Sequence, residues 1–194
     1  MVRAPGPVAD RLRIGLLGGS FNPAHEGHLH VSSRALTVLN LDYVWWLVSP
    51  QNPLKTANDM AAFGKRLDFA REFARHPRIC VSDIEADLGT RYSVDTVRAL
   101  KGRFPRVKFV WIVGSDNLLQ LPRWRRWENL LAVVPVAVVS RPGSSLAART
   151  GAVARRFGHA LRSADGAFAE AMPPAIAMLD GPRNAQSATR IRAG

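Results

Sequence analysis

Residues 18–28 read Gly-Gly-Ser-Phe-Asn-Pro-Ala-His-Glu-Gly-His, directly after a short apolar run and before a segment with helical spacing. The two glycines let the backbone approach a ligand closely, because they carry no side chain. A helix that begins after them presents unpaired N–H groups and the positive end of its dipole, and both attract anions. His25 and His28 are three residues apart, so their imidazoles can share a helix face and donate toward one phosphate. The segment therefore predicts a phosphate-binding turn between a strand and a helix.

Other sites built from glycines and histidines fit this segment less well. No Gly-Lys-Ser/Thr follows the double glycine, so the segment is not a Walker A loop. Gly15 and the two later glycines also lack the spacing of the dinucleotide fingerprint. A zinc site would need ligands beyond the paired histidines, and Cys80 with scattered histidines supplies them poorly; His30 is interpreted as structural. Spacing alone favours a phosphate over a metal ion.

Strand-like and helix-like segments alternate along the rest of the chain, which is typical of a parallel sheet covered by helices. Ser93 is expected to cap one helix and Ser187 the last one, which would be shortened. We predict one doubly wound α/β domain over residues 1–194 with a mainly parallel sheet, and a flexible segment at residues 1–10. Strands are expected over residues 11–17, 43–48, 78–82, 107–113, 133–139 and 175–179, and helices over 27–39, 60–75, 93–103 and 146–161.

Composition excludes several classes of protein. The chain has 194 residues, 47% of them hydrophobic, and no apolar run near the roughly 20 residues that a membrane span needs. A single cysteine and the absence of a signal-peptide pattern indicate a cytoplasmic protein. The net charge of +12 comes from 27 basic residues and suits phosphate-rich ligands, but it is weak support for nucleic-acid binding. We therefore expect neither a nucleic-acid nor a membrane partner.

Blocks of residues along the whole chain support a sharper interpretation. Together with Gly18–Pro23 and the His-x-Gly-His that follows, they resemble the nucleotidyltransferase superfamily of adenylyl- and cytidylyltransferases. Within that superfamily they resemble the bacterial nicotinate-mononucleotide adenylyltransferases, and they occur in that family's order. The later blocks are Ser49-Pro50-Gln51-Asn52-Pro53-Leu54-Lys55, Tyr92-Ser93-Val94-Asp95-Thr96, Gly114-Ser115-Asp116 with Trp124 after it, Arg141-Pro142-Gly143, and Ser187-Ala188-Thr189-Arg190-Ile191-Arg192.

The resemblance implies a Rossmann-like fold, an activity and a set of site residues. The activity joins AMP from ATP to nicotinate mononucleotide, giving nicotinate adenine dinucleotide (deamido-NAD) and pyrophosphate in NAD biosynthesis. Mg²⁺ would be carried by the ATP phosphates, with no metal site in the protein. The implied residues are His25, His28 and Arg192 for catalysis; Gly18, Gly19, Ser20, Phe21, His25, His28, Gly114, Asp116, Ser187, Thr189 and Arg192 for ATP; and Lys55, Tyr92, Ser93 and Trp124 for the mononucleotide.

Purely structural roles stay open for some of these residues. His25 and Asp116 could serve as helix caps, and Ser187 taken alone is more often a plain cap. Trp127 is interpreted as core, as are the strand tryptophans Trp45, Trp46 and Trp111.

Other activities also stay open. A nicotinamide-mononucleotide or phosphopantetheine adenylyltransferase is the nearest alternative. More remote ones are a basic nucleic-acid-binding module and a metal-dependent hydrolase that uses the two histidines. The sequence does not fix the oligomeric state.

Overall fold

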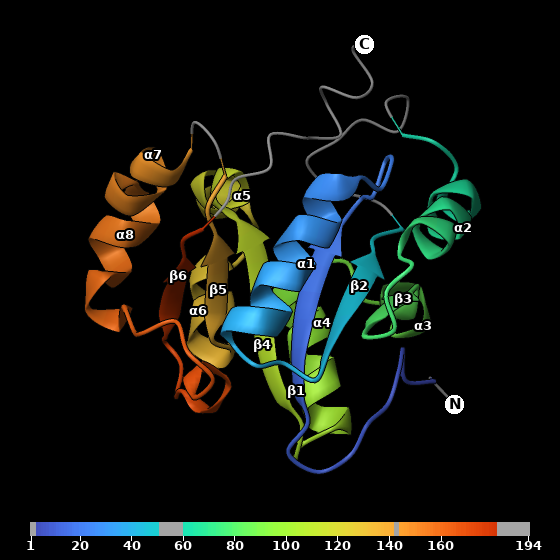
Figure 1. Ribbon diagram of the computed structural model, residues 1–194, viewed down its shortest axis with the longest axis horizontal. Helices are drawn as coiled ribbons and strands as arrows, with labels where there is room; N and C mark the ends of the chain where they lie inside the picture. The colour runs from blue at the N-terminus through green and yellow to red at the C-terminus, as the bar shows by residue number, and fades with distance from the viewer. Residues whose placement is uncertain (1–2, 51–59, 142–143, 182–194) are drawn as a thin grey trace.

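The computed structural model describes residues 3–50, 60–141 and 144–181, which form an α/β fold around a central sheet (Figure 1). The strands are β1 (Arg13–Gly19), β2 (Tyr43–Val48), β3 (Ile79–Ser82), β4 (Lys108–Gly114), β5 (Val136–Val139) and β6 (Ile176–Leu179). The α-helices are α1 (Glu26–Val38), α2 (Phe63–Phe73), α3 (Ile84–Asp87), α4 (Ser93–Arg103), α5 (Ser115–Gln120), α6 (Trp127–Val133), α7 (Ser145–Thr150) and α8 (Ala152–Phe157). Short 3₁₀ turns are η2 (Leu121–Arg123), η3 (Gly158–Ala160) and η4 (Phe168–Glu170).

The sheet has six strands in the order β3-β2-β1-β4-β5-β6, and each neighbouring pair is parallel. Strands covered on both faces are apolar at nearly every position. β2 illustrates this, because Trp45 and Trp46 point to opposite faces and both are fully buried. The prediction of a doubly wound, Rossmann-like α/β fold is therefore confirmed, and the sheet is parallel throughout.

Helices cover the two faces of the sheet and enclose two hydrophobic clusters (Figure 1). One cluster lies under α1 and α2 and contains Val31, Leu36 and Leu67. The other lies under α4 and α6 and contains Val97 and Leu130. None of the described helices is long and apolar enough to cross a membrane.

The structure corrects three local predictions. The strand expected over 133–139 begins at Val136, because the preceding apolar residues up to Val133 belong to α6. The helix expected over 146–161 is divided at Gly151, whose extended backbone separates α7 from α8. Ser93 is the first residue of α4 and not its cap: the N-cap position belongs to Tyr92 and has no side-chain hydrogen bond.

The order of the strands reverses between β1 and β4. Chain connections from β1 run outward toward β2 and β3, and those from β4 run the other way toward β5 and β6. Such a switch point leaves a crevice beyond the carboxyl ends of the two central strands, where ligands of doubly wound proteins bind. Gly19 ends β1 and Gly114 ends β4, so both glycines lie at this crevice.

Candidate active site

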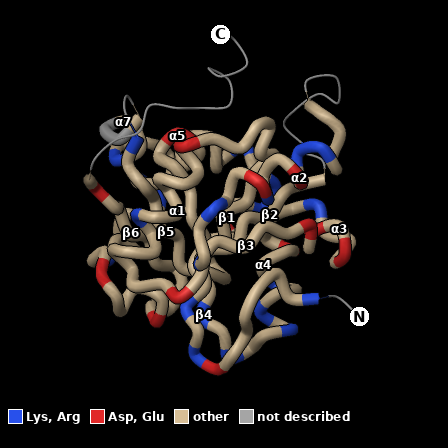
Figure 2. Tube along the Cα trace, turned by 45° about the vertical axis from the view of Figure 1, so that its right-hand side comes forward, with Lys and Arg blue, Asp and Glu red and all other residues tan. Residues whose placement is uncertain are grey.

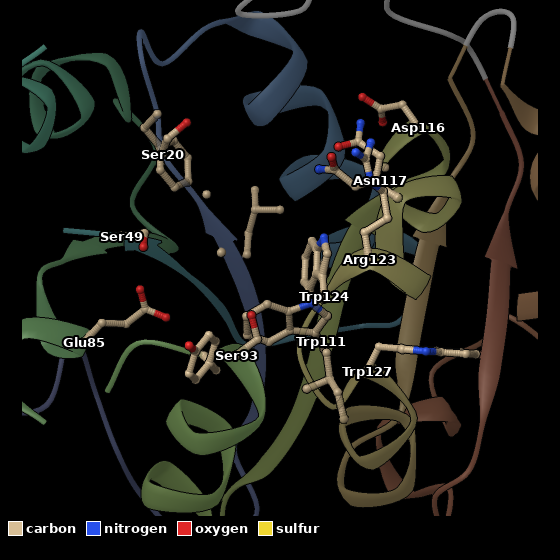
Figure 3. A pocket seen from close by; sticks show the side chains of 18 of the residues that line it. Ser20, Ser49, Glu85, Ser93, Trp111, Asp116, Asn117, Arg123, Trp124 and Trp127 are labelled. Atoms are coloured by element: carbon tan, nitrogen blue, oxygen red, sulfur yellow. The ribbon is translucent and has the colours of Figure 1, made fainter. Parts of the chain in front are cut away.

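A cavity of about 560 Å³ opens at the switch point (Figure 3). In Figure 3, Ser20, Ser49 and Glu85 lie on one side, whereas Asp116 and Arg123 lie on the other. Its walls come from the turn after β1, the first turns of α1 and α4, and the segment after β4. The lining residues include Gly18, Gly19, Ser20, Phe21, His25, His28, Ser49, Glu85, Arg91, Tyr92, Ser93, Trp111, Gly114, Asp116, Asn117, Arg123, Trp124, Arg125, Trp127 and Arg141.

The paired histidines form a reciprocal cap at the start of α1. His25 is the N-cap residue, with extended backbone, and its Nδ1 accepts the N–H of Gly27 at 3.0 Å. His28, at the third helical position, accepts the backbone N–H of His25 through its own Nδ1 at 3.2 Å. This is the pattern of a capping box, with imidazoles in place of the usual hydroxyl and carboxylate. The two ring centroids are 3.9 Å apart.

The cap selects which nitrogen carries the proton in each neutral ring. A neutral imidazole has one donor and one acceptor nitrogen, so a ring whose Nδ1 accepts an N–H carries its proton on Nε2. The pKa of His25 is lowered to about 4, mainly by burial and also by the positive charge of Arg141, while the charge of Asp116 opposes the shift. His25 is therefore neutral at pH 7 and offers an Nε2–H donor.

Aromatic packing holds the second ring. Phe21 lies 4.6 Å from the His28 ring and 5.0 Å from Trp46, measured between centroids. Phe21 and Trp46 are both nearly fully buried. A ring packed in this way has few alternative rotamers, so its nitrogens keep a defined direction.

A partly buried ion pair lies beside the end of β4. The Arg141 guanidinium contacts Oδ2 of Asp116 at 3.4 Å and the carbonyl of Gly27 at 3.5 Å. Glycine at position 114 leaves room for this pair, because a Cβ there would lie 2.4 Å from Oδ1 of Asp116 and 2.8 Å from Nε of Arg141. Asp116 does not cap α5, whose N-cap is Gly114 without a side-chain bond. The capping interpretation of Asp116 is thus wrong, and its carboxylate faces the cavity.

Two tryptophans line the cavity at its aromatic end. The ring of Trp124 meets that of Trp111 edge to face, with centroids 6.5 Å apart. Trp111 is buried, as expected of a core residue, yet it also forms part of the wall. A Cβ at Gly18 would come within 2.7 Å of the Trp111 ring, so that glycine makes room for it. Trp127, also expected in the core, packs on Phe157 and lines the cavity as well.

The start of α4 supplies the remaining wall. Tyr92 and Ser93 line it, and the Arg125 guanidinium lies over the Tyr92 ring at 5.2 Å. Glu85, only 5% exposed, accepts a hydrogen bond from Thr96 at 3.1 Å. Burial raises the pKa of Glu85, while hydrogen bonds from Thr96 and Ser49 act in the opposite direction.

The charges on the wall suit an anionic ligand. Arg91, Arg123, Arg125 and Arg141 line the cavity, against the carboxylates of Asp116 and Glu85. Over the whole fold, Figure 2 shows Lys and Arg on several elements with Asp and Glu between them. Within the described residues, no group of three or more His, Cys, Asp or Glu side chains could hold a metal ion.

Most of the residues predicted for the site line this cavity. Eleven of the predicted residues line the cavity, whereas Lys55, Ser187, Thr189 and Arg192 fall outside the described residues. Arg141, Glu85 and Ser49 received no individual role from the sequence. The eleven are Gly18, Gly19, Ser20, Phe21, His25, His28, Tyr92, Ser93, Gly114, Asp116 and Trp124.

Solved structures with the same fold include adenylyltransferases. The Plasmodium falciparum nicotinic acid mononucleotide adenylyltransferase complexed with NaAD superposes with a TM-score of 0.69 at 16% identity, covering 93% of this chain and 82% of that one. A putative nicotinate-nucleotide adenylyltransferase from Vibrio parahaemolyticus gives a TM-score of 0.56 at 18% identity, covering 70% and 77%. These likenesses concern the fold.

Sequence relatives are much closer. The chain matches the cytidylyltransferase-like family over residues 16–194. It is 58% identical to a Parvibaculum lavamentivorans protein named "Probable nicotinate-nucleotide adenylyltransferase", over 93% of this chain and 91% of that protein. A Caulobacter protein of the same name is 50% identical over 93% and 97%. The chain therefore belongs to the cytidylyltransferase-like family and, within it, to the nicotinate-nucleotide adenylyltransferases.

Proposed function

We propose that this enzyme transfers AMP from ATP to nicotinate mononucleotide, releasing pyrophosphate and forming nicotinate adenine dinucleotide for NAD biosynthesis. One observation carries the proposal. The capped histidine pair at the start of α1 shares a single cavity with Trp124 and the first turn of α4. A triphosphate can thus lie on the histidines while a pyridine ring reaches the aromatic end. The relatives named above support the choice of co-substrate.

The chemistry needs no nucleophile from the protein. An oxygen of the mononucleotide 5′-phosphate attacks the α-phosphorus of ATP, a new P–O bond forms, and the bond to the oxygen bridging α and β breaks as pyrophosphate leaves. Rate then depends on alignment and on stabilising charge at the transferring and leaving oxygens. We assign those donors to the Nε2–H groups of His25 and His28 and to the α1 N-terminus, with His28 as the main transition-state stabiliser.

The adenosine side is assigned to the end of β4. Gly114 lines the cavity there and leaves room for the Asp116 side chain, whose carboxylate offers an acceptor for ribose hydroxyls. Oδ1 of Asp116 is buried without a hydrogen-bond partner, so it has a vacant acceptor position that faces Gly114.

The pyridine side is assigned to Trp124, Tyr92 and Ser93. A flat ring stacks on Trp124 with little loss of side-chain entropy. Ser93 and the backbone amides of the first turn of α4 hold the nicotinate carboxylate, because a helix N-terminus attracts anions. Hydrogen bonds to that substituent separate the acid from the amide.

The cavity suits a cation carried by the nucleotide. Mg²⁺ carried by the ATP phosphates would neutralise part of their charge, with the phosphates themselves as its main ligands. The sequence-based roles of Lys55, Ser187, Thr189 and Arg192 as phosphate ligands remain part of the proposal. We also propose that residues 1–194 act as one nucleotidyltransferase domain in the cytoplasm.

Pyrophosphate release from Mg-ATP tests the proposal directly. Nicotinate mononucleotide, nicotinamide mononucleotide and phosphopantetheine are compared as co-substrates at equal concentration. We expect the highest kcat/KM with nicotinate mononucleotide, and formation of the dinucleotide in equal amount to pyrophosphate. A higher kcat/KM with phosphopantetheine, or no transfer to any of the three, would reject the assignment.

A further inference from the structure

We propose that Arg66 is a positioning residue that fixes the turn after β1 relative to the end of β2, and so aligns the phosphate-binding wall. Arg66 lies on α2, outside the residues that line the cavity. Its side chain reaches the carboxyl ends of the two neighbouring strands, where the catalytic turn begins. It therefore acts through other residues and does not touch substrate.

The guanidinium of Arg66 is buried among backbone carbonyls. The residue is only 3% exposed. Nη1 donates to the carbonyls of Ser20 and Ser49, Nη2 donates to that of Pro50 at 3.0 Å, and Nε donates to that of Ala61 at 3.0 Å. One planar group thus connects the turn after β1, the end of β2 and the segment before α2.

These carbonyls belong to the wall of the cavity. Ser20 and Ser49 both line it, and the N–H of Ser49 donates to the carbonyl of Gly19 at 2.9 Å. Ser49 also hydrogen-bonds Glu85 through its side chain. The anchored turn leads within five residues to His25, so a shift at Ser20 moves the histidine donors.

Only arginine has the geometry for this contact. Its five N–H donors lie in one rigid plane and can reach several carbonyls at once, whereas lysine has a single compact ammonium group. Burial lowers the pKa of Arg66, in keeping with a cation that has left water. An apolar side chain of similar volume would fill the same space without the cost of removing a charge from water, so packing alone does not explain an arginine at this position.

A second hydrogen bond connects the turn after β1 to the segment before α2. Oδ1 of Asn22, in the turn after β1, accepts the backbone N–H of Ala61 at 3.3 Å. Arg66 donates to the carbonyl of Ala61, so this residue before α2 is held through both its N–H and its carbonyl. The turn is consequently tied to α2 at Ser20 and at Asn22.

The inference rests on the proposed adenylyl transfer, and the variants Arg66→Lys and Arg66→Gln test it. We expect Arg66→Lys to lower kcat roughly 10- to 100-fold, because misaligned donors lose stabilisation of the transition state. The KM for ATP should change less than about threefold, since ground-state binding depends less on alignment. Leu67→Ala is the matched control: this neighbour on α2 is buried in the core, so its loss should lower the melting temperature and leave kcat within about twofold.

Hydrogen exchange gives a readout that is independent of turnover. Amides in the peptide 18–22 should exchange at least about tenfold faster in Arg66→Lys than in Leu67→Ala, when each variant is measured equally far below its own melting temperature. Equal exchange and equal kcat in these two variants would overturn the inference. So would loss of folding in both Arg66 variants, because Arg66 would then serve stability. An inactive wild-type enzyme would reject the proposed function alone, and exchange would still decide the role of Arg66.

Discussion

Replacing His28 by alanine removes two contributions of one ring. Nδ1 of His28 accepts the backbone N–H of His25 and so completes the cap of α1. Nε2 is the donor that we assign to the transferring phosphates. The first contribution affects stability and the second affects rate, so the two can be measured separately in one variant.

The expected losses have different sizes. A preorganised donor at a developing negative charge contributes about 3 kcal/mol to the barrier, so kcat should fall on the order of 100- to 1,000-fold. Loss of a helix cap costs about 1 kcal/mol of unfolding free energy. His28→Gln separates these effects, because a glutamine at the third helical position can keep the acceptor of a capping box. It should therefore recover most of the stability.

Pyrophosphate release at saturating Mg-ATP and nicotinate mononucleotide measures kcat, and urea unfolding measures stability. Turnover of His28→Ala within about threefold of wild type would refute the donor role, since a loss of one donor predicts far more. Equal stability losses in His28→Ala and His28→Gln would refute the capping role. Circular dichroism at the assay temperature confirms that each variant is folded.

Three further predictions concern neighbouring residues. His25 is protonated between pH 7 and pH 5 in the unfolded chain, where its pKa is near 6.5, but not in the folded chain, where its pKa is about 4. The unfolding free energy should therefore fall as pH falls over this range. In urea titrations, His25→Asn, which can still cap the helix, should lose about 2 kcal/mol less than the wild type. Trp124→Ala should raise the KM for nicotinate mononucleotide roughly 3- to 10-fold and leave the KM for ATP unchanged in steady-state kinetics, and an equal rise for both would contradict ring stacking. Gly18→Ala should lower the unfolding free energy by about 1–3 kcal/mol, because the new Cβ clashes with Trp111. Gly102→Ala on α4 should raise the unfolding free energy slightly, because the space around its Cβ is open. A change of the same sign in both variants would contradict the packing argument.

Much of the fold could be predicted because buried parallel strands are apolar along their whole length. The β2 segment at residues 43–48 is such a run, and its bounds were predicted correctly. The same property causes the error before β5. Residues 130–139 are apolar almost without interruption, and an apolar run does not show where a helix ends and a strand begins. Leu130 and Leu131 belong to α6, where both side chains are buried in the core.

The candidate site was predictable where one local segment makes it. The glycines, the histidines and the first turn of α4 each form a short motif with a chemical interpretation. Other residues are placed in the site by contacts between segments far apart in sequence. Arg141 pairs with Asp116, 25 residues away, and Arg66 donates to Ser20, 46 residues away. Glu85 accepts hydrogen bonds from Thr96 and Ser49, which lie on either side of it in sequence. A signal for Glu85 did exist, because it follows β3 at the carboxyl edge of the sheet where ligands bind. For a single buried arginine on a helix, the sequence contains no such signal.

Capping and phosphate binding are not competing roles for His25. An aspartate could cap the helix equally well, but it would place a negative charge where an anion binds, and a serine would use its short side chain on the cap. Imidazole has two nitrogens on opposite sides of one rigid ring. Because Nδ1 accepts the Gly27 N–H, Nε2 must carry the proton, and burial together with Arg141 keeps the ring neutral. The contact that stabilises the helix thereby selects the tautomer that the reaction needs, so a His25 variant that retains the cap but lacks the second nitrogen should fold and transfer AMP slowly.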